Sequence, residues 1–369
     1  MSLYAEPPFG TPCGASVRTD VNFADRPGDQ MTPRAEDREQ KSLALREVGV
    51  FWWLEMPSVI LEVLMRNVYW RWAGLRRWRR RRERRRRPAI QACAREDLCA
   101  HLESIGVRSG ALVMLHTRVS GVHFLAGAAA EEVDSWHVSR ALLSLVFDLL
   151  GPTGTLAMVT NAKFQHDDLE GKHSANEAIT YDPERTPCSV GLANELFWRG
   201  NGVKRSLYPF NMLAARGPLA DELLRDNLNE RKPSPHGVDS GYCRFCQLNG
   251  LVVSVGVPLR DCITIAHVVE EVRLDWPIKD FFIEKRYRVV QGGVAKEWAI
   301  RLPREKYDRF CHCGKKMGLD LVAEGVIHEG RVGTLRVDWA RAGEVFEFFW
   351  RKTEKGPYPY YGLWGSLST

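Results

Sequence analysis

A histidine and a glutamate are spaced so that both side chains would lie on one face of a helix. His267 and Glu270 are three residues apart in the segment Cys262–Val272, which has the apolar spacing of a helix. An imidazole titrates near neutral pH and can accept a proton, while a carboxylate can orient that imidazole. One interpretation of the spacing is therefore an active-site pair. The same residues would also serve as a structural pair that closes the helix onto a sheet.

A short loop directly follows a predicted buried strand. The apolar run Ala111–Leu115 is typical of such a strand, and His116, Thr117, Arg118 and Val119 come next. Open α/β sheets bind ligands beyond the carboxyl ends of their strands. Backbone N–H groups and the threonine hydroxyl would donate hydrogen bonds there, and the arginine would pair with a phosphate. The alternative is a turn whose histidine caps nearby backbone.

A second anion-binding element is predicted near residue 190. Pro187 and Ser189 suit the first turn of a helix that continues through Ala193–Trp198. The free N–H groups and partial positive charge of a helix N-terminus suit a phosphate or an oxyanion. Every helix has such an end, so this pattern alone identifies no ligand. Neither a Gly-x-Gly-x-x-Gly nor a P-loop pattern follows a predicted strand, which argues against dinucleotide and nucleoside triphosphate chemistry.

Cysteine spacing raises the question of a zinc site. Cys243 and Cys246 have a suitable gap for zinc, whereas Cys311 and Cys313 are separated by a single residue, which is tighter than usual. We favour buried or free thiols and predict no metal. Nine cysteines in 369 residues do not suggest a disulfide framework, so a reducing cytoplasm is expected.

The order of the predicted elements defines the fold class. A helix at Glu96–Ser104 precedes the first strand, and a helix at Val133–Leu150 precedes the second, so the same unit occurs twice. The strands are predicted at Ala111–Leu115, Thr155–Thr160, Gly250–Val257, Arg286–Gly293 and Gly330–Asp338. We therefore expect an α/β fold with a central mixed, partly antiparallel sheet flanked by helices, in one domain over residues 89–369.

The chain before this domain differs from it in composition. Residues 1–40 are rich in Pro, Gly, Asp and Arg without apolar periodicity, which predicts a disordered tail. Residues 41–88 join an apolar and aromatic stretch to ten arginines between Arg76 and Arg87. Residues 1–89 carry 18 Lys and Arg against 11 Asp and Glu, a net charge of +7. The total of +6 leaves −1 for residues 90–369.

Several roles fit the segment 41–88. A helix of this kind would make a peripheral contact with an anionic membrane surface, or it would pack against the main domain with its basic end in solvent. A third interpretation is that part of this segment does not belong to the native protein, since a translated upstream region would have a similar composition. We expect no specific nucleic-acid partner, since nonspecific charge is all that the arginines offer. The most apolar stretch, Val48–Met65, contains Glu55, Pro57 and Glu62, so no membrane-spanning helix is expected.

Five segments of the chain match known family patterns in order and at compatible spacing. They are Val113–Val119, Leu149–Thr160, Asp182–Gly191, Arg205–Pro209 with Ala214, Ala215 and Gly217, and Thr264–Glu270. The corresponding patterns read llvHsSl, lGpdGTLvmpT, fDp..TpsrmG, RS.HP..s.aA.G and T.lH.aE. With these segments the chain resembles the aminoglycoside 3-N-acetyltransferase family over roughly Asp97–Val272.

The resemblance implies an acyltransferase that moves an acetyl group from acetyl-CoA to a small-molecule amine acceptor, often an aminosugar. It also implies which residues bind the cofactor. They are His116, Thr117, Arg118, Val119, Ser189, Gly191, Arg205 and Ser206. Arg118 stands where the family usually has a small hydroxyl residue, so we expect the cofactor geometry to differ here.

Tyr208 occupies the position of the family's expected general base, the histidine of RS.HP. A tyrosine hydroxyl, with an ordinary pKa of about 10, is a poor base at neutral pH, although it could protonate a leaving thiolate. His236, in a loop resembling the family's p.g..Spl loop near the acceptor, is a candidate to supply the base, as are His267 with Glu270 and His116. The alternatives are a packing role for Tyr208 and a non-catalytic or altered-chemistry relative that binds CoA or a glycan.

Overall fold

The structure is a computed structural model that describes most of the chain after residue 60. The described residues are 61, 64–65, 68–69, 71–85, 90–126, 129–130, 134–162, 164, 178–231, 233–273, 276, 278, 281–304 and 314–354. The predicted tail at 1–40 lies outside them. Within the described part, no helix combines the length and the apolar character needed to cross a bilayer.

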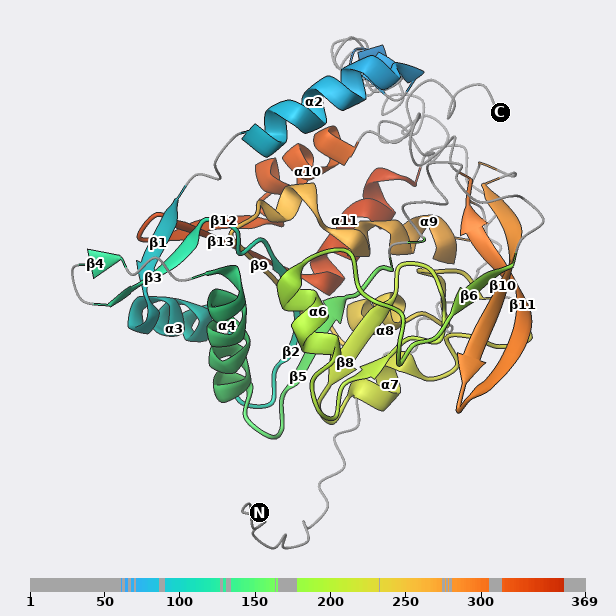
Figure 1. Cartoon of the computed structure of the whole chain (residues 1–369), viewed down its shortest axis with the longest axis horizontal. Helices are drawn as coiled ribbons and strands as arrows, with labels where there is room; N and C mark the ends of the chain where they lie inside the picture. The colour runs from blue at the N-terminus through green and yellow to red at the C-terminus, as the bar shows by residue number, and fades with distance from the viewer. Residues whose placement is uncertain are drawn as a thin grey trace, which may run out of the picture.

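A seven-stranded mixed sheet forms the centre of the molecule (Figure 1). Its strands, in spatial order, are β12 (His328–Val332), β13 (Leu335–Arg341), β9 (Leu251–Val255), β2 (Leu112–Thr117), β5 (Thr155–Val159), β8 (Leu213–Arg216) and β7 (Lys204–Arg205). β2 pairs in parallel with both β9 and β5, whereas the outer pairs are antiparallel. The predicted mixed, partly antiparallel sheet is thus confirmed.

Helices cover both faces of this sheet because its strands alternate apolar side chains between two cores. Val113 and Leu115 of β2 join one core, and Leu112 and Met114 join the other. The first core is completed by α3 (Arg95–Ser104), α4 (Ser135–Leu150) and α6 (Leu192–Trp198). The second is completed by α7 (Ala220–Leu224), α8 (Gly241–Gln247), α9 (Val268–Val272), α10 (Gly314–Ala323) and α11 (Ala342–Lys352).

Two small sheets flank the central one. β10 (Phe282–Gln291) and β11 (Val294–Pro303) form a hairpin, and β6 (Ile179–Tyr181) adds to it in parallel. This sheet carries a third, smaller core. The other sheet joins β1 (Gln91–Ala94), β3 (Val122–Ala126) and β4 (Ala129–Ala130).

Three sequence predictions need correction. Pro187 and Ser189 do not form the first turn of a helix, because α6 begins at Leu192 with Gly191 as its N-cap. The strand expected at Gly330–Asp338 is in fact parts of β12 and β13, because the chain reverses at Gly333, where φ is +57°. The helix expected at Cys262–Val272 begins as a 3₁₀ turn, η3 (Thr264–His267), and becomes α-helical only in α9.

Helix α2 (Ala73–Arg85) carries the arginine run and lies at the outer edge of the molecule, beyond α10 (Figure 1). The division of the chain near residue 88 stays an interpretation from composition.

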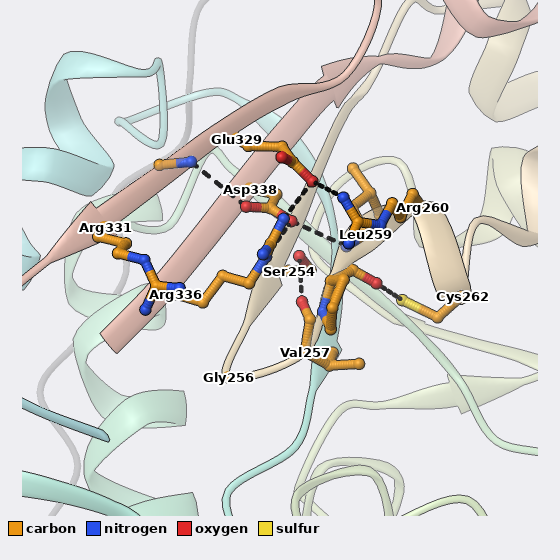
Figure 2. Close-up of polar contacts among 12 residues, drawn as sticks. Ser254, Gly256, Val257, Leu259, Arg260, Cys262, Glu329, Arg331, Arg336 and Asp338 are labelled. Carbon is orange, nitrogen blue, oxygen red and sulfur yellow. Dashed lines mark hydrogen bonds and ion pairs between the residues drawn. The ribbon is translucent and has the colours of Figure 1, made fainter. Parts of the chain in front are cut away.

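A buried carboxylate fixes the turn that follows β9. The Asp338 side chain, in β13, is completely buried and accepts hydrogen bonds from the Leu259 N–H (3.0 Å) and from Nε of Arg336 (2.7 Å). Arg336 also pairs with Glu329, which pairs in turn with Arg260 (2.7 Å), as Figure 2 shows. The network therefore holds η2 (Leu259–Asp261) against the β12–β13 hairpin.

Removing the Asp338 carboxylate should destabilise the protein. Asp338→Ala leaves the buried Leu259 N–H without its acceptor and Arg336 without a main partner, which typically costs about 3–5 kcal/mol. Urea unfolding measures the free energy. The control is Glu297→Ala, which breaks an exposed pair with Arg288 and should cost less than about 1 kcal/mol. Equal, small losses in both variants would contradict the proposed importance of the network.

Candidate active site

A cavity of about 500 Å³ lies where the parallel strands β2, β5 and β9 end. Its lining residues are His116, Thr117, Arg118, Val119, Ser120, Ser135, Val159, Asn161, Val190, Gly191, Leu192, Ala193, Asn194, Val257, Cys262 and Thr264. The carboxyl edge of parallel strands is the usual ligand site of open α/β sheets. The predicted loop after the first strand thus borders a cavity, as does the start of α6.

Close backbone packing shapes the loop after β2. The Arg118 N–H donates to the Val255 carbonyl (3.0 Å), and the Arg118 carbonyl lies over Gly256. A Cβ on Gly256 would be 2.3 Å from that oxygen, and φ there is +77°, so only glycine fits. This constraint keeps the loop folded back along β9 and leaves its side chains at the cavity.

Two buried polar atoms of the cavity lining have no hydrogen-bond partner among the described residues. They are Nε2 of His116 and Oδ1 of Asn161. Burial lowers the pKa of His116 to about 4, so its imidazole is neutral at physiological pH. Buried polar groups are nearly always paired, so these two atoms suit a ligand with amide or hydroxyl groups.

The predicted cofactor residues divide into two groups. His116, Thr117, Arg118, Val119 and Gly191 line the cavity.

Ser189, Arg205 and Ser206 are absent from the described lining, and their contacts are structural. Arg205 donates to the carbonyls of Thr160 and Thr186, and Ser189 donates to the Asn161 carbonyl (3.1 Å). Ser206 accepts a hydrogen bond from the backbone N–H two residues later (3.0 Å). These contacts hold the segments that form the wall, and direct binding of the cofactor by the three residues stays a prediction.

His236 forms a buried pair with Glu271. Its Nδ1 lies 2.8 Å from Oε1 of Glu271, and its backbone N–H donates to Oε2 of the same carboxylate (2.7 Å). Burial alone would raise the pKa of Glu271, but the charge of His236 and its hydrogen bonds outweigh that effect. They hold the pKa below its ordinary value. The carboxylate therefore stays ionised and fixes the imidazole.

Two asparagines connect this pair to the cavity. Asn161 in the lining donates through Nδ2 to Oδ1 of Asn211 (3.2 Å), and Nδ2 of Asn211 lies 3.1 Å from Nε2 of His236. Because Oδ1 of Asn211 already accepts from Asn161, its amide N–H groups face the imidazole. In the neutral imidazole, the proton then lies on Nδ1 toward Glu271 and a lone pair lies on Nε2. This is the tautomer that a general base requires.

The other predicted catalytic pair lies beside His236. Nδ1 of His267 is 3.1 Å from Oε2 of Glu270, and its ring centroid is 5.4 Å from that of His236. The structure therefore gathers three of the four predicted catalytic residues. It adds Glu271 and Asn211, which sequence reasoning missed. The acidic pair in the sequence Val269-Glu270-Glu271 was the available signal for Glu271; Asn211 had none.

Tyr208 makes buried contacts outside the His236–Glu271 pair. Its side chain is buried, and its hydroxyl lies within hydrogen-bonding distance of the Pro233 carbonyl (3.2 Å) and the Arg301 carbonyl. Burial, with the charge of Glu271, raises its pKa well above the ordinary value. A protonated hydroxyl that faces two carbonyls is a poor proton acceptor. These contacts support the segment before His236, and the catalytic role of Tyr208 stays a prediction.

No cluster of three or more metal-ligating side chains occurs among the described residues. Cys243 and Cys246 are free thiols packed in the second core. Cys311 and Cys313 lie outside the described part of the chain.

A family model described as aminoglycoside 3-N-acetyltransferase matches residues 114–353, almost two thirds of the chain. The chain belongs to this family. The family resemblance read from the five segments is thereby confirmed, and with it the acyltransferase class and the use of acetyl-CoA.

Relatives are similar along most of their length. Aminoglycoside N(3)-acetyltransferase IX of Micromonospora chalcea is 26% identical over 265 residues, covering 67% of this chain and 88% of the relative. Aminoglycoside N(3)-acetyltransferase VII of Streptomyces paromomycinus is 29% identical over 277 residues, covering 69% and 89%. A solved structure of AAC-IIIb with CoASH has a TM-score of 0.56 at 20% identity, covering 72% of this chain and 98% of that one. The fold is therefore that of the acetyltransferase family.

The cavity fits the acyl donor of this family. Pantetheine contains two amides, and each has a donor N–H and an acceptor carbonyl. These groups suit Nε2 of His116 and Oδ1 of Asn161, which have no hydrogen-bond partner among the described residues. Arg118 would pair with a phosphate. Bound acetyl-CoA supplies a reactive thioester to the site.

Protonation of His116 should weaken the fold in mild acid. Its pKa is about 4 in the folded chain and near 6.5 when unfolded, so below pH 6.5 the unfolded state binds a proton that the folded state excludes. We expect this residue to remove up to about 3 kcal/mol of stability between pH 7 and pH 4. Urea unfolding across this range should show a shallower decline in His116→Gln. Parallel curves for variant and wild type would refute the assignment.

Proposed function

We propose that this chain acetylates an amino group of an aminosugar or aminoglycoside-like acceptor in the cytoplasm, with His236 as the general base. The observation that carries the proposal is the continuous hydrogen-bonded path from the cavity through Asn161 and Asn211 to the His236–Glu271 pair. The free thiols of the described cysteines support a reducing compartment.

The proposed reaction is derived from the positions of the protons on His236 and on the acceptor amine. The acceptor amine displaces the Asn211 amide from Nε2 of His236 and gives its proton to that nitrogen as it bonds to the acetyl carbon. The bond between carbon and sulfur breaks, and the leaving thiolate takes the proton from Nε2 of His236, which restores the neutral imidazole. Glu271 stabilises the imidazolium through Nδ1, because the buried carboxylate is ionised before the proton arrives.

The class of acceptor is proposed from charge and from relatives. Glu270 and Glu271 place carboxylates around His236 and His267, which suits a cationic amine. Solved structures of AAC-VIa with sisomicin and of an AAC(3)-IVa mutant with apramycin show that such neighbours bind aminoglycosides. A biosynthetic aminosugar is the close variant, and an acceptor panel separates the two.

Acetyl transfer is tested directly with the full chain. Acetyl-CoA, a panel of aminoglycosides and simple aminosugars, and a thiol reagent report CoA release, while mass spectrometry locates the added acetyl group. We expect release only when an amine is present. The proposal would be refuted if no acceptor caused release of CoA and calorimetry showed no binding of CoA.

Substitution of the His236–Glu271 pair should reduce turnover while sparing cofactor binding. His236→Ala removes the base, and Glu271→Gln removes the charge that stabilises its protonated form. General-base contributions predict losses in kcat of about 10²–10⁴-fold. Calorimetry with CoA should change little, which also checks that the variants are folded.

Tyr208→Phe is the matched control for this prediction. It removes only the hydroxyl that faces the Pro233 and Arg301 carbonyls, so kcat should stay within about threefold, with a stability loss of about 1–3 kcal/mol. A loss of kcat as large as that of His236→Ala would restore Tyr208 to the chemistry and contradict our assignment. The non-catalytic alternative, which was motivated by Tyr208 and by the N-terminal extension, is tested by the same assay of CoA release.

A further inference from the structure

Helical hydrogen bonding extends across the start of α2. The Trp72 N–H donates to the Val68 carbonyl (3.0 Å), and the Arg76 N–H donates to the Trp72 carbonyl (3.2 Å). Both bonds have the four-residue spacing of an α-helix, and the described residues at 61, 64–65, 68–69 and 71 are helical too. The apolar residues before α2 and its arginines therefore share one helical direction.

Large apolar side chains form an exposed stripe along this direction. We call apolar stripe the residues Leu61, Leu64, Met65, Val68 and Trp72, which are 47% to 65% exposed. At 3.6 residues per turn they fall within an arc of about 100°. None of the three cores contains a described residue from 61–85. A contiguous apolar face of this kind on the surface marks an interaction site.

Strong positive charge follows the stripe directly. α2 contains eight arginines and one glutamate, a net charge of +7. Trp78 is also exposed, with the Arg82 guanidinium 5.3 Å above its ring. The surface therefore combines an apolar face, interfacial tryptophans and concentrated cationic charge.

This combination selects one kind of partner. A nucleic acid would use the arginines but would gain nothing from burying leucine, methionine and valine. A second copy of the chain would bring two charges of +7 together. An anionic lipid surface matches both parts, since acyl chains take the apolar stripe and headgroup phosphates take the guanidinium groups.

We propose that residues 61–85 dock the protein peripherally on anionic membranes, with the apolar stripe at the acyl boundary and the α2 arginines on the headgroups. The segment lies on the surface rather than across the bilayer. This inference does not depend on acetyl transfer, because lipid binding is measured without acceptor or acetyl-CoA.

Vesicle flotation of the full chain tests the proposal. Vesicles of phosphatidylglycerol and phosphatidylcholine in equal parts should carry the protein, whereas phosphatidylcholine alone should not. Leu64→Ser with Trp72→Ser removes apolar contact, and Arg81→Gln with Arg82→Gln removes charge. Each arginine near an anionic surface contributes about fivefold in affinity, so we expect a loss of about tenfold or more in the charge variant. The stripe variant should lose a comparable amount.

Matched controls come from exposed residues elsewhere. Val294→Ser replaces an apolar side chain that is 71% exposed, and Arg108→Gln with Arg185→Gln removes two exposed arginines. Both should bind vesicles within about twofold of wild type, and thermal unfolding should be unchanged in all variants, since each altered side chain is exposed.

Three results would overturn the proposal. One is the absence of binding to the anionic vesicles, and another is equal binding to neutral ones. The third is full binding by the stripe variant together with a loss of binding by the charge variant. In that case a gel shift with RNA, also lost only by the charge variant, would identify a polyanion as the partner instead.

Discussion

Burial of the Glu271 carboxylate is the constraint on which the site depends. An ionised carboxylate without solvent is costly unless hydrogen bonds and an opposite charge compensate it. His236 supplies both its ring and its backbone N–H, and Ser234 adds a hydrogen bond. The loop that carries His236 cannot move away without leaving the charge uncompensated. The imidazole is thus fixed by the same contacts that make burial of the acid tolerable.

Sheet register explains why hydrogen bonds connect this fixed imidazole to the cavity. β5 and β8 are antiparallel, with Val159 opposite Leu213. Continuing that register places Asn161, just after β5, opposite Asn211, just before β8. Asn211 has a φ of +46°, a conformation that asparagine tolerates better than most residues, and this turns its amide toward His236. A parallel pair at this position would have separated the two amides.

Local patterns predicted the elements better than the contacts between them. α3, α4, β2, β5 and β9 follow from apolar periodicity and turn residues, and the cavity loop follows from its place after β2. No local sequence pattern predicts the hydrogen bonds that connect Asn161, Asn211, His236 and Glu271, because tens of residues separate each of them from the next. Tyr208 shows a different limit of sequence patterns. A motif match placed it in sequence, but burial and two carbonyl partners decided where its hydroxyl points.

Charge separates the two substrates of the proposed reaction. Arg118 is the one ionised side chain among the described lining residues of the cavity, since His116 is neutral there. That wall favours an anionic phosphoester and disfavours a cationic amine. Around His236 the charged side chains are instead the carboxylates of Glu270 and Glu271. In the proposed reaction the acceptor amine therefore lies near His236 and the acyl donor lies at the strand ends. The Asn161–Asn211 hydrogen bond connects these two places.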